Sequence, residues 1–275
     1  MAPYKPYIHR DTAVHISVGI VTYNSVEVIG RTVESISSAV SNASRIEILV
    51  RDNGSRDGTV GLLEDLSRRI DSLQLISGGD NIGYGRGHNC ILRRALGDIH
   101  IICNPDIVVR ENFFQKIEAF LDVHPDVGLM SPRMTFEDGT LQHSLRRHPN
   151  VLDLALRRFL PAAYEKWFRT RLSHYEMADN GYATSCDVPF CSGALMVCRR
   201  EALDAVGGFD ERYFLYFEDA DLCREMQRVG WRTVFNHEIS VIHDWQRASH
   251  KDLGMMLLMV RNGIRYFQKW GWRWW

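Results

Sequence analysis

The sequence lacks the features that mark several specialised classes of protein. It has no long apolar run: the longest, Leu253 to Val260, is far shorter than the about 20 residues that a membrane-spanning helix needs. The segment from Met1 to His15 is polar and contains no apolar core of a secretory signal. The 33 Lys and Arg residues are balanced by 34 Asp and Glu, which argues against a nucleic-acid-binding protein.

Two signatures of nucleotide-binding proteins are also missing. No GxxxxGK[ST] loop occurs, and Gly83, Gly85 and Gly87 follow the third predicted strand with a spacing that differs from GxGxxG. The sequence therefore argues against a P-loop kinase and a Rossmann dehydrogenase. The six cysteines show no CxxC spacing, so we expect buried free thiols in a cytoplasmic protein rather than disulfides or a zinc site.

The balanced net charge hides two basic segments. Residues 143–175 contain seven Lys or Arg against two acidic side chains, and residues 245–275 contain six against one. The rest of the chain is correspondingly acidic. This segregation of charge is the first indication of function.

The first 125 residues alternate between two patterns. Apolar, β-branched runs predict strands at 16–24, 47–52, 73–77 and 99–104, and apolar residues at helical spacing predict helices at 26–40, 57–70, 84–96 and 112–123. This alternation predicts an α/β fold with a doubly wound, mostly parallel sheet that is covered on both faces. We therefore expect residues 15–125 to form a nucleotide-binding half.

The pattern changes in the second half, at 126–250. Strands are predicted at 127–134, 188–199, 233–236 and 240–243, and helices at 218–229 and 253–270. The segment 135–190 is predicted to be irregular, and it is basic and aromatic. Because the sequence has no linker or repeat, we expect one domain over 1–250, followed by a basic, aromatic C-terminal helix within 251–275.

Polar residues follow each of the four strands of the first half. They are Thr22 and Asn24 after the first strand, Asp52 after the second, Asn81 and Gly83 after the third, and Asn104 and Asp106 after the fourth. The carboxyl ends of parallel strands meet at one edge of the sheet, where ligands bind. Turn formation would explain any one of these residues, but four polar strand ends together favour a ligand site.

Three further groups have the chemistry of a reactive site. Asp106 suits a hard divalent cation such as Mg²⁺ or Mn²⁺ held together with phosphates, or else it caps the following helix. His243 ends an apolar strand and is either a ligand of metal or phosphate or a structural histidine. The acidic residues Glu218, Asp219 and Asp221 open a helix after an aromatic run. They either cap that helix, or their apolar surroundings raise a carboxyl pKa into the range of a general base.

Taken together, these motifs resemble the inverting family-2 glycosyltransferases with a GT-A fold. The resemblance extends from about residue 15 to 250 and rests on VTYNS, VRDNGSRDGT, GDNIGYGRGHN, NPD, CSGALMV, GGFDERYFLYFEDADLC and VIH, in that order. Within this family the chain is most similar to bacterial rhamnosyltransferases that use dTDP-L-rhamnose and act in polysaccharide assembly, for example of O-antigen.

The resemblance implies a role for each matching residue. The nucleotide sugar would be bound by Thr22, Asn24, Asp52, Asn81, Gly83, Arg86 and Asn104. Asp106 would hold a divalent metal, Mg²⁺ or Mn²⁺, although the chain has only the second acid of the family's DxD-like motif. His243 would complete the metal or diphosphate site. Asp219 would be the catalytic base, with Glu218 and Asp221 as supporting groups.

The implied reaction transfers L-rhamnose from dTDP-β-L-rhamnose to a lipid-linked saccharide, such as polyprenyl-diphosphate GlcNAc, with inversion at the anomeric carbon. Either the lipid diphosphate or only solvent would contact Arg146, Arg147, Arg157 and Arg158. A cationic stripe beside several tryptophans favours a peripheral helix on the cytoplasmic face of the membrane; it consists of Arg261, Arg265, Lys269 and Arg273. The alternative is a helix docked on the protein through Met255, Leu258 and Met259.

Other functions remain open at this point. A transferase with a UDP- or GDP-sugar donor would share the same motifs. An inactive sugar-nucleotide-binding scaffold is disfavoured because Asp52, Asp106 and Asp219 are all present. A nucleotidyltransferase would need a glycine-rich, basic loop after the first strand, which residues 24–27 do not supply. A glycoside hydrolase also pairs carboxylates but has no need of the nucleotide motifs.

Overall fold

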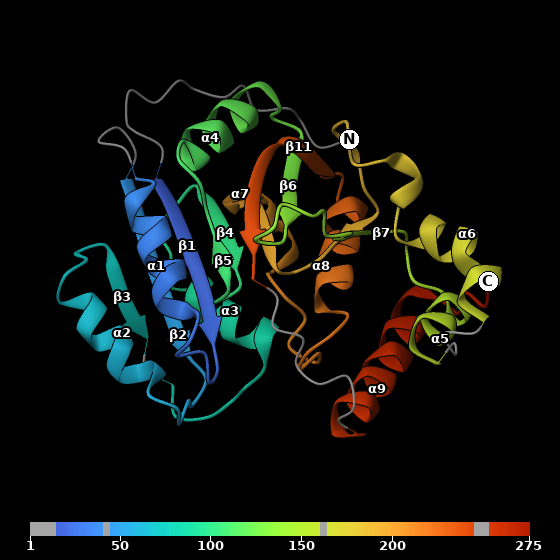
Figure 1. Cartoon of the computed structure of the whole chain (residues 1–275), viewed down its shortest axis with the longest axis horizontal. Coiled ribbons are helices and arrows are strands. Elements are labelled where there is room, and N and C mark those ends of the chain that lie inside the picture. The colour runs from blue at the N-terminus through green and yellow to red at the C-terminus, as the bar shows by residue number, and fades with distance from the viewer. Residues whose placement is uncertain (1–14, 41–44, 77, 160–163, 245–252) are drawn as a thin grey trace.

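The computed structural model describes residues 15–40, 45–76, 78–159, 164–244 and 253–275. Its centre is a nine-stranded sheet with the order β3-β2-β1-β4-β10-β6-β11-β5, in which β8 also pairs with β11 (Figure 1). The strands are β1 His15–Thr22, β2 Arg45–Asp52, β3 Leu73–Ile76, β4 Ile99–Cys103, β5 Ile107–Val108, β6 Val127–Thr135, β8 Cys186–Asp187, β10 Leu195–Arg199 and β11 Arg232–His243. A separate two-stranded sheet is formed by β7 Leu145–Arg146 and β9 Phe190–Cys191.

The strands β3, β2, β1 and β4 run parallel, as predicted. Alternate residues of β1 enter opposite cores: Ile16, Val18 and Ile20 lie in one apolar cluster and Val21 in another. Burial on both faces explains why this strand is an almost continuous apolar run. The register brings Thr22 opposite Asp52 at the carboxyl ends of β1 and β2.

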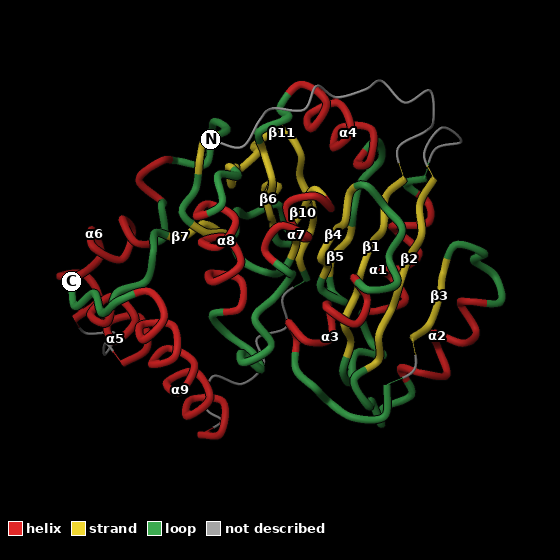
Figure 2. The backbone as a smooth tube through the Cα atoms, turned by 180° about the vertical axis from the view of Figure 1, so that it is seen from behind, coloured by secondary structure: helices red, strands yellow, loops and turns green. Residues whose placement is uncertain are grey.

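Helices cover both faces of the sheet (Figures 1 and 2). On one face, α1 Ile29–Ser38, α2 Thr59–Ser67 and α4 Phe113–Val123 share an apolar core with β1, β2, β4 and β6. On the other face lie α3 Tyr84–Leu92, α7 Arg200–Val206 and α8 Glu218–Arg228. This is the doubly wound, mostly parallel α/β arrangement predicted from the sequence.

The second half of the sheet is mixed in direction. β10 runs antiparallel to β4 and β6, whereas β6 and β11 are parallel. The single strand predicted at 188–199 is instead two strands, β9 and β10, because the chain turns at Gly193 to contact α8. The two strands predicted at 233–236 and 240–243 are one strand with a bulge, where Asn236 Oδ1 accepts the N–H groups of Glu238 and Ile239.

The expectation that 135–190 is irregular was wrong. This segment contains α5 Val151–Phe159, α6 Glu165–Tyr175 and a short 3₁₀ helix, Ala178–Asn180. The Asn150 side chain caps α5 by accepting the N–H of Asp153 at 2.8 Å. The first two N–H groups of α5 donate to the carbonyls of Arg273 and Trp274, so part of this cap comes from the distant C-terminal segment.

The C-terminal helix α9 Leu253–Trp270 has the predicted bounds. Together with α5 and α6 it lies at the end of the molecule opposite α2 and β3 (Figure 1). It docks through four buried residues, Asn262, Gly263, Tyr266 and Phe267. The residues predicted to dock it, Met255, Leu258 and Met259, are only partly buried.

Other expectations about this end of the chain have mixed outcomes. Two members of the predicted cationic stripe bind the protein itself: Arg265 donates to the carbonyl of Arg212, and Lys269 pairs with acidic residues of α8. Arg247 and Lys251 of the basic segment lie outside the described residues. Within the described ranges, none of the helices is long and apolar enough to cross a membrane. All six cysteines are free thiols, as predicted, and four of them are buried.

Candidate active site

The predicted site residues gather at one edge of the sheet. Thr22 and Asp52 end the neighbouring strands β1 and β2, and Asp106 lies between β4 and β5. The antiparallel pairing of β11 with β5 places His243 opposite Ile107, and the N–H of Asp244 donates to the carbonyl of Asp106 at 2.9 Å. Strand pairing therefore brings residues from both halves of the sequence to the same edge.

Asp52 and Thr22 present unused polar atoms at this edge. Asp52 is 3% exposed, and its Oδ2 accepts the N–H groups of Gly54 and Ser55, each at 2.9 Å. Within the described part of the chain, Asp52 Oδ1 and Thr22 Oγ1 are buried without a hydrogen-bond partner. Unpaired buried polar atoms are energetically costly, so both atoms are placed to bind a ligand.

Three asparagines hold the loops around Asp52. Asn24 is exposed; its N–H donates to Ser55 Oγ at 2.7 Å, and its Oδ1 accepts the N–H of Arg56 at 2.9 Å. Asn81 Oδ1 accepts the N–H of Gly83 at 3.1 Å. Asn53, which the sequence analysis did not single out, is buried and donates to Asn81 Oδ1 and to the carbonyl of Gly83. These bonds tie together the loops that follow β1, β2 and β3.

Gly83 joins the two halves of the molecule. Its φ is +89°, and a Cβ atom there would lie 2.4 Å from the carbonyl oxygen of Phe214, so only glycine fits. That carbonyl accepts the N–H of Tyr84 at 2.8 Å. The loop after β3 therefore contacts the aromatic run that precedes α8.

The two remaining predicted nucleotide residues are also placed by protein contacts. Arg86 pairs with Glu211, with 3.0 Å between Nε and Oε2, and both side chains are exposed enough to rearrange around a ligand. The N–H of Asn104 donates to the carbonyl of Ala194 at 2.8 Å, which fixes the residue two positions before Asp106 next to the Gly193 turn.

Asp106 and His243 form a buried pair. His243 Nε2 lies 3.3 Å from Asp106 Oδ1, and their side chains are 9% and 14% exposed. Neither of these two atoms has a hydrogen-bond partner among the described residues. On its other side, His243 Nδ1 lies 2.8 Å from Oε1 of Gln142, a residue that the sequence analysis did not single out. His243 Nε2 and Asp106 Oδ1 are thus left without a partner in the described structure at this edge of the sheet.

Asp219 lies at the start of α8 with its carboxylate fixed by the backbone. Oδ1 accepts the N–H of Ala220 at 2.8 Å, and Oδ2 accepts the N–H of Gly193 at 3.1 Å. The Gly193 carbonyl in turn accepts the hydroxyl of Tyr84 at 2.6 Å. Burial raises the pKa of Asp219, while the two N–H bonds and the charge of Arg146 act against that rise. The group is thus a carboxylate of increased basicity in a partly buried position.

Glu218 and Asp221, on either side of Asp219, have different environments. Burial, followed by the Asp219 charge, raises the pKa of Glu218 well above its usual range and favours its neutral form. Asp221 is 1% exposed and points to α9: it accepts Lys269 Nζ at 2.8 Å and Trp270 Nε1 at 2.7 Å. Any support that Asp221 gives to Asp219 therefore acts through the docking of α9 on α8.

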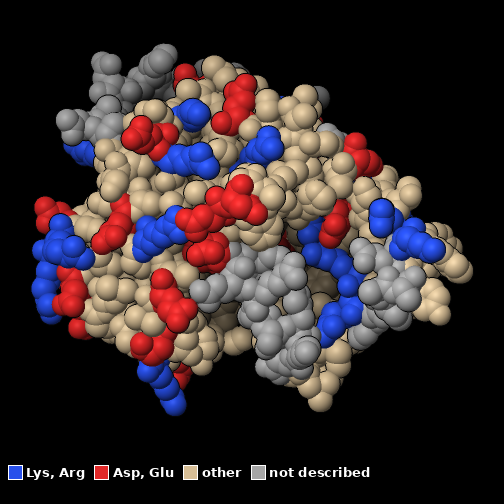
Figure 3. Space-filling view, viewed as in Figure 1, with Lys and Arg blue, Asp and Glu red and all other residues tan. Residues whose placement is uncertain are grey.

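The four arginines predicted to bind the acceptor separate into two groups. Arg146 and Arg157 both approach Glu176 Oε1, at 3.6 and 3.5 Å, and Arg146 is near enough to Asp219 to lower its pKa. Burial and the charge of Glu218 raise the pKa of Tyr216, in the aromatic run before Glu218, and the nearby charge of Arg158 acts against that rise. Figure 3 shows Lys or Arg side chains around a hollow between the central sheet and the end of the molecule that contains α5, α6 and α9.

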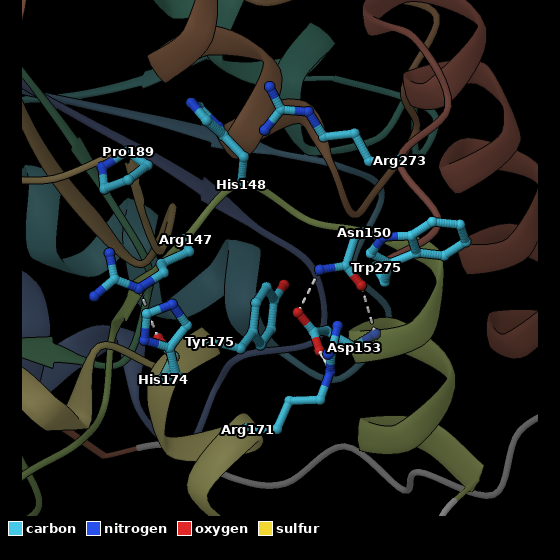
Figure 4. A pocket seen from close by; sticks show the side chains of 10 residues that line it. All are labelled: Arg147, His148, Asn150, Asp153, Arg171, His174, Tyr175, Pro189, Arg273 and Trp275. Carbon is cyan, nitrogen blue, oxygen red and sulfur yellow. Dashed lines mark hydrogen bonds and ion pairs between the residues drawn. The ribbon is translucent and has the colours of Figure 1, made fainter.

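The side chain of Arg147 lies in a different environment from the other three arginines. It pairs with Asp179 at 3.0 Å and lines a cavity of about 430 Å³ between α5, α6 and the C-terminal segment. Figure 4 shows Tyr175 near the middle of this cavity, with Arg147 and His174 on one side and Asp153 and Arg171 on another. Of the residues that line it, only Arg147 belongs to the predicted site.

Solved structures share this fold. A mannosyltransferase from Pyrobaculum calidifontis, solved with GDP-Man and Mn²⁺, matches with a TM-score of 0.62 and 20% identity over 96% of this chain and 67% of its own. GalNAc-T7, solved with UDP, GalNAc and Mn²⁺, matches with a TM-score of 0.69 and 16% identity over 93% of this chain and 48% of its own. The chain therefore has the GT-A fold of these glycosyltransferases.

Sequence comparison narrows this class. The chain belongs to glycosyl transferase family 2, whose profile matches residues 17–207. It is 28% identical to an N-acetylglucosaminyl-diphospho-decaprenol L-rhamnosyltransferase of Mycobacterium tuberculosis, over 86% of this chain and 78% of the relative. It is 25% identical to the rhamnosyltransferase WbbL of Escherichia coli, over 84% and 83%. The protein is therefore an enzyme that transfers sugars, and its relatives include rhamnosyltransferases.

Proposed function

We propose that the enzyme transfers L-rhamnose from dTDP-β-L-rhamnose to a lipid-linked saccharide, with polyprenyl-diphosphate GlcNAc as the acceptor. The names of the M. tuberculosis and E. coli relatives support the rhamnosyl group, and the former supports the acceptor. The observation that carries the chemistry is the Asp219 carboxylate, fixed by two N–H groups at the edge of the sheet where the donor half meets the acceptor half. In this division, residues 15–125 bind the donor and residues 126–250 supply the base and the acceptor site.

The unpaired atoms of Thr22 and Asp52 support a site for the nucleotide. Asp52 Oδ1 is an acceptor and matches the ring N–H of thymine or uracil. Gly54 and Ser55 fix the other carboxylate oxygen, so the free oxygen has a defined direction. The loops held by Asn24, Asn53 and Asn81 then border the ribose and the diphosphate.

Asp106 and His243 fit a divalent metal, Mn²⁺ or Mg²⁺. A carboxylate oxygen and an imidazole nitrogen face each other at 3.3 Å, both buried and both without a partner in the described structure. Across the described ranges no group of three or more His, Cys, Asp or Glu side chains could hold a metal, so the donor diphosphate would supply further ligands. A cation bound there would neutralise charge on the leaving diphosphate.

The proposed reaction is a single displacement. Asp219 accepts the proton of the acceptor hydroxyl while that oxygen forms a bond with the anomeric carbon. The bond between the anomeric carbon and the diphosphate oxygen breaks on the opposite face, and dTDP leaves. The β-configured donor therefore yields an α-rhamnoside. Gly193 and Ala220 keep the Asp219 carboxylate aimed during the proton transfer.

The acceptor is proposed to lie beside α5 and α6, close to the membrane surface. Arg146, Arg157 and Arg158 lie near Glu176, Asp219 and Tyr216, so they can neutralise a lipid diphosphate next to the base. Peripheral contact with the cytoplasmic face of the membrane would bring the lipid to this site. The exposed apolar face of α9 would supply the contact surface.

The first test replaces the proposed base. We expect Asp219→Asn to lower the transfer rate by about 10²–10⁴-fold, because the amide cannot accept the proton, while donor binding stays near normal. Glu218→Gln is the matched control: Glu218 is held neutral, so its amide should alter the rate far less. An Asp219→Asn enzyme that retains wild-type transfer would remove Asp219 from this role.

The second test identifies the donor. Thermal unfolding is measured with dTDP-rhamnose, UDP-GlcNAc, UDP-galactose and GDP-mannose, each with and without Mn²⁺. A bound ligand stabilises the folded state, by about 2.7 kcal/mol at 100 times its Kd. We expect the largest shift with dTDP-rhamnose. A shift with only a UDP- or GDP-sugar would keep the enzyme class and reject rhamnose.

A further inference from the structure

We infer that Gln142 is a positioning residue that fixes the tautomer of His243 and thereby makes the Asp106–His243 site selective for Mn²⁺ over Mg²⁺. This inference rests on the metal role proposed above for the two ligands. It concerns Gln142, which comes directly after the hairpin that follows β6 and is 8% exposed.

The orientation of the Gln142 amide is determined by the backbone. One end of the side chain lies 2.7 Å from the carbonyl oxygen of His243. A carbonyl can only accept a hydrogen bond, so this end must be the NH₂ group, Nε2. The Gln142 carbonyl oxygen, Oε1, then necessarily faces the His243 ring. The backbone N–H of Gln142 donates to the carbonyl of Met134 at 2.9 Å, which fixes the residue against the end of β6.

The amide orientation determines which ring nitrogen carries the hydrogen. Oε1 of Gln142 lies 2.8 Å from His243 Nδ1, and an amide oxygen cannot donate, so Nδ1 must carry the hydrogen. In the neutral imidazole, Nε2 is then left with a lone pair. That lone pair faces Asp106 Oδ1 at 3.3 Å, which is also an acceptor. Gln142 therefore leaves two buried acceptors facing each other.

Two facing acceptors form a ligand pair that needs a cation. Metal-binding histidines commonly donate their second ring N–H to an outer partner that fixes the ring, and Gln142 occupies that position. An imidazole nitrogen favours Mn²⁺, a softer ion, more than it favours Mg²⁺, which prefers oxygen ligands in an octahedral shell. By keeping Nε2 available, Gln142 determines that the site has one nitrogen ligand and one oxygen ligand.

The test measures metal binding by the full chain without substrates. Free Mn²⁺ is followed by electron paramagnetic resonance as protein is added, and Mg²⁺ affinity is measured by competition. We expect Gln142→Leu to weaken Mn²⁺ binding by about 10–100-fold and Mg²⁺ binding by less, so that the Mn²⁺/Mg²⁺ affinity ratio falls. Gln142→Glu keeps an acceptor for Nδ1 but has no N–H for the His243 carbonyl, so its Mn²⁺ affinity should lie between those of the wild type and Gln142→Leu. Gln268→Leu, a change at an exposed position on α9, should have no effect.

A second measurement reports the tautomer directly. Long-range ¹H–¹⁵N spectra of the metal-free protein are recorded at a pH where the His243 ring is neutral, with its signals identified through His243→Ala, and should show the hydrogen on Nδ1 and none on Nε2. In Gln142→Leu these signals should show a mixture of tautomers. A wild-type ring protonated at Nε2, or a Gln142→Leu protein with unchanged Mn²⁺ affinity, would overturn the inference and leave the transferase proposal intact. Equal Mn²⁺ binding by wild type and His243→Ala would reject the metal site itself, while the Asp219 test still decides the reaction.

Discussion

At the scale of single residues, Tyr84 connects the loop after β3 to the turn that holds the proposed base. Its side chain is partly buried, and burial raises its pKa well above the usual range, with further contributions from nearby groups that include Glu218, Asp219 and Asp106. Its hydroxyl donates to the Gly193 carbonyl at 2.6 Å, and the Gly193 N–H donates to Asp219 at 3.1 Å. The position of the Gly193 peptide, and with it the aim of Asp219, depends on this hydroxyl.

We expect Tyr84→Phe to lower kcat by about tenfold with little change in the donor KM, because removing one hydrogen bond costs about 1 kcal/mol or more. The pH profile should also move. Asp219 must be ionised to act, so the rate falls as the pH drops through its pKa. The Gly193 bond lowers that pKa, and loosening it should shift the acidic limb of the kcat profile to higher pH. Tyr164→Phe, at a half-exposed position, is the control. An unmoved profile in Tyr84→Phe would limit Tyr84 to a packing role.

The arginines of the acceptor side provide a matched comparison. We expect Arg157→Gln to raise the KM for a lipid-diphosphate acceptor by roughly 10-fold or more, since a charge-assisted contact contributes about 1.5–3 kcal/mol. The donor KM should not change. Arg147→Gln removes an arginine that lies ten residues earlier but pairs with Asp179 away from the base, so it should leave both constants near wild type. Equal effects of the two substitutions would argue for general charge attraction instead of a defined site.

The sequence pointed to some of these residues and not to others. Asp52, Asp106, Asp219 and His243 could be proposed from the sequence because each lies at or just after the end of a strand, or at the start of a helix, within a recognisable motif. Gln142 and Tyr84 were missed because their roles depend on contacts across 101 and 109 positions of the chain, to His243 and Gly193. Local patterns contain no information on such pairs. The four candidate arginines looked equivalent in sequence, and only the structure separates Arg147 from the other three.

At the scale of elements, α3 and β4 each bury a histidine. His88 on α3 and His100 on β4 are both 1% exposed, and none of their four ring nitrogens has a hydrogen-bond partner in the described structure. Burial lowers the pKa of His100 to about 3 and that of His88 well below its usual value, and each is lowered further by a nearby charge. Both rings must therefore be neutral in the folded protein, whereas in the unfolded chain they titrate near 6.5.

This difference predicts an acid-sensitive fold. As the pH falls below 6.5 the unfolded state gains protons that the folded state cannot take up, so stability decreases. Each histidine should contribute about 1.4 kcal/mol of loss between pH 7.5 and 5.5. We expect His100→Leu to reduce the measured loss by about that amount in urea unfolding at the two pH values. His237→Leu, at a partly exposed position, should leave the loss unchanged. A His100→Leu protein as acid-sensitive as wild type would contradict this account.

Most elements of the first half were predicted because each strand and helix has its own pattern of apolar residues. The helices α5 and α6 were missed, although Asn150 and Asp153 form a recognisable N-cap pair. The basic and aromatic composition of that segment outweighed this signal. Part of the α5 cap comes from the carbonyls of Arg273 and Trp274, more than 120 positions away. The boundary of α5 therefore depends on tertiary structure that a local pattern cannot report.

At the scale of the whole molecule, α9 has a buried face and an apolar exposed face. Its C-terminal half is held on α8 by Lys269 and Trp270, which both bind Asp221. On the outer side, Leu253, Leu257, Val260 and Ile264 recur at helical spacing and are 42–63% exposed. Trp272, Trp274 and Trp275 are also exposed. The exposed side of α9 therefore carries an apolar stripe rather than the cationic stripe predicted from the sequence, and the exposed tryptophans follow the helix, where Trp272 stacks on the buried Phe267.

This arrangement favours peripheral contact with an anionic bilayer. It also predicts that exposed apolar residues of α9, in addition to basic ones, contribute to membrane binding. We expect Leu257→Gln combined with Val260→Gln to reduce binding to vesicles of anionic phospholipid by roughly tenfold or more, because each side chain would lose contact with the acyl region. Binding is measured by co-sedimentation. The matched control is Leu96→Gln with Val123→Gln, two positions that are also exposed, at 74% and 68%, but lie away from α9.

Substitutions of Lys269 and Arg261 on α9 distinguish a loss of membrane binding from a loss of the contacts that dock α9 on α8. Lys269→Met removes a partner of the buried Asp221 carboxylate and should lower the free energy of unfolding by about 1–3 kcal/mol, with vesicle binding reduced only if α9 detaches. Arg261→Gln removes an exposed charge next to Val260 and should weaken binding to anionic vesicles more than to neutral ones. If the Leu257/Val260 double variant and the Leu96/Val123 control bind vesicles equally, the exposed stripe of α9 does not contact the membrane and has another partner. A lipid-linked acceptor would then have to reach Asp219 without α9 on the membrane.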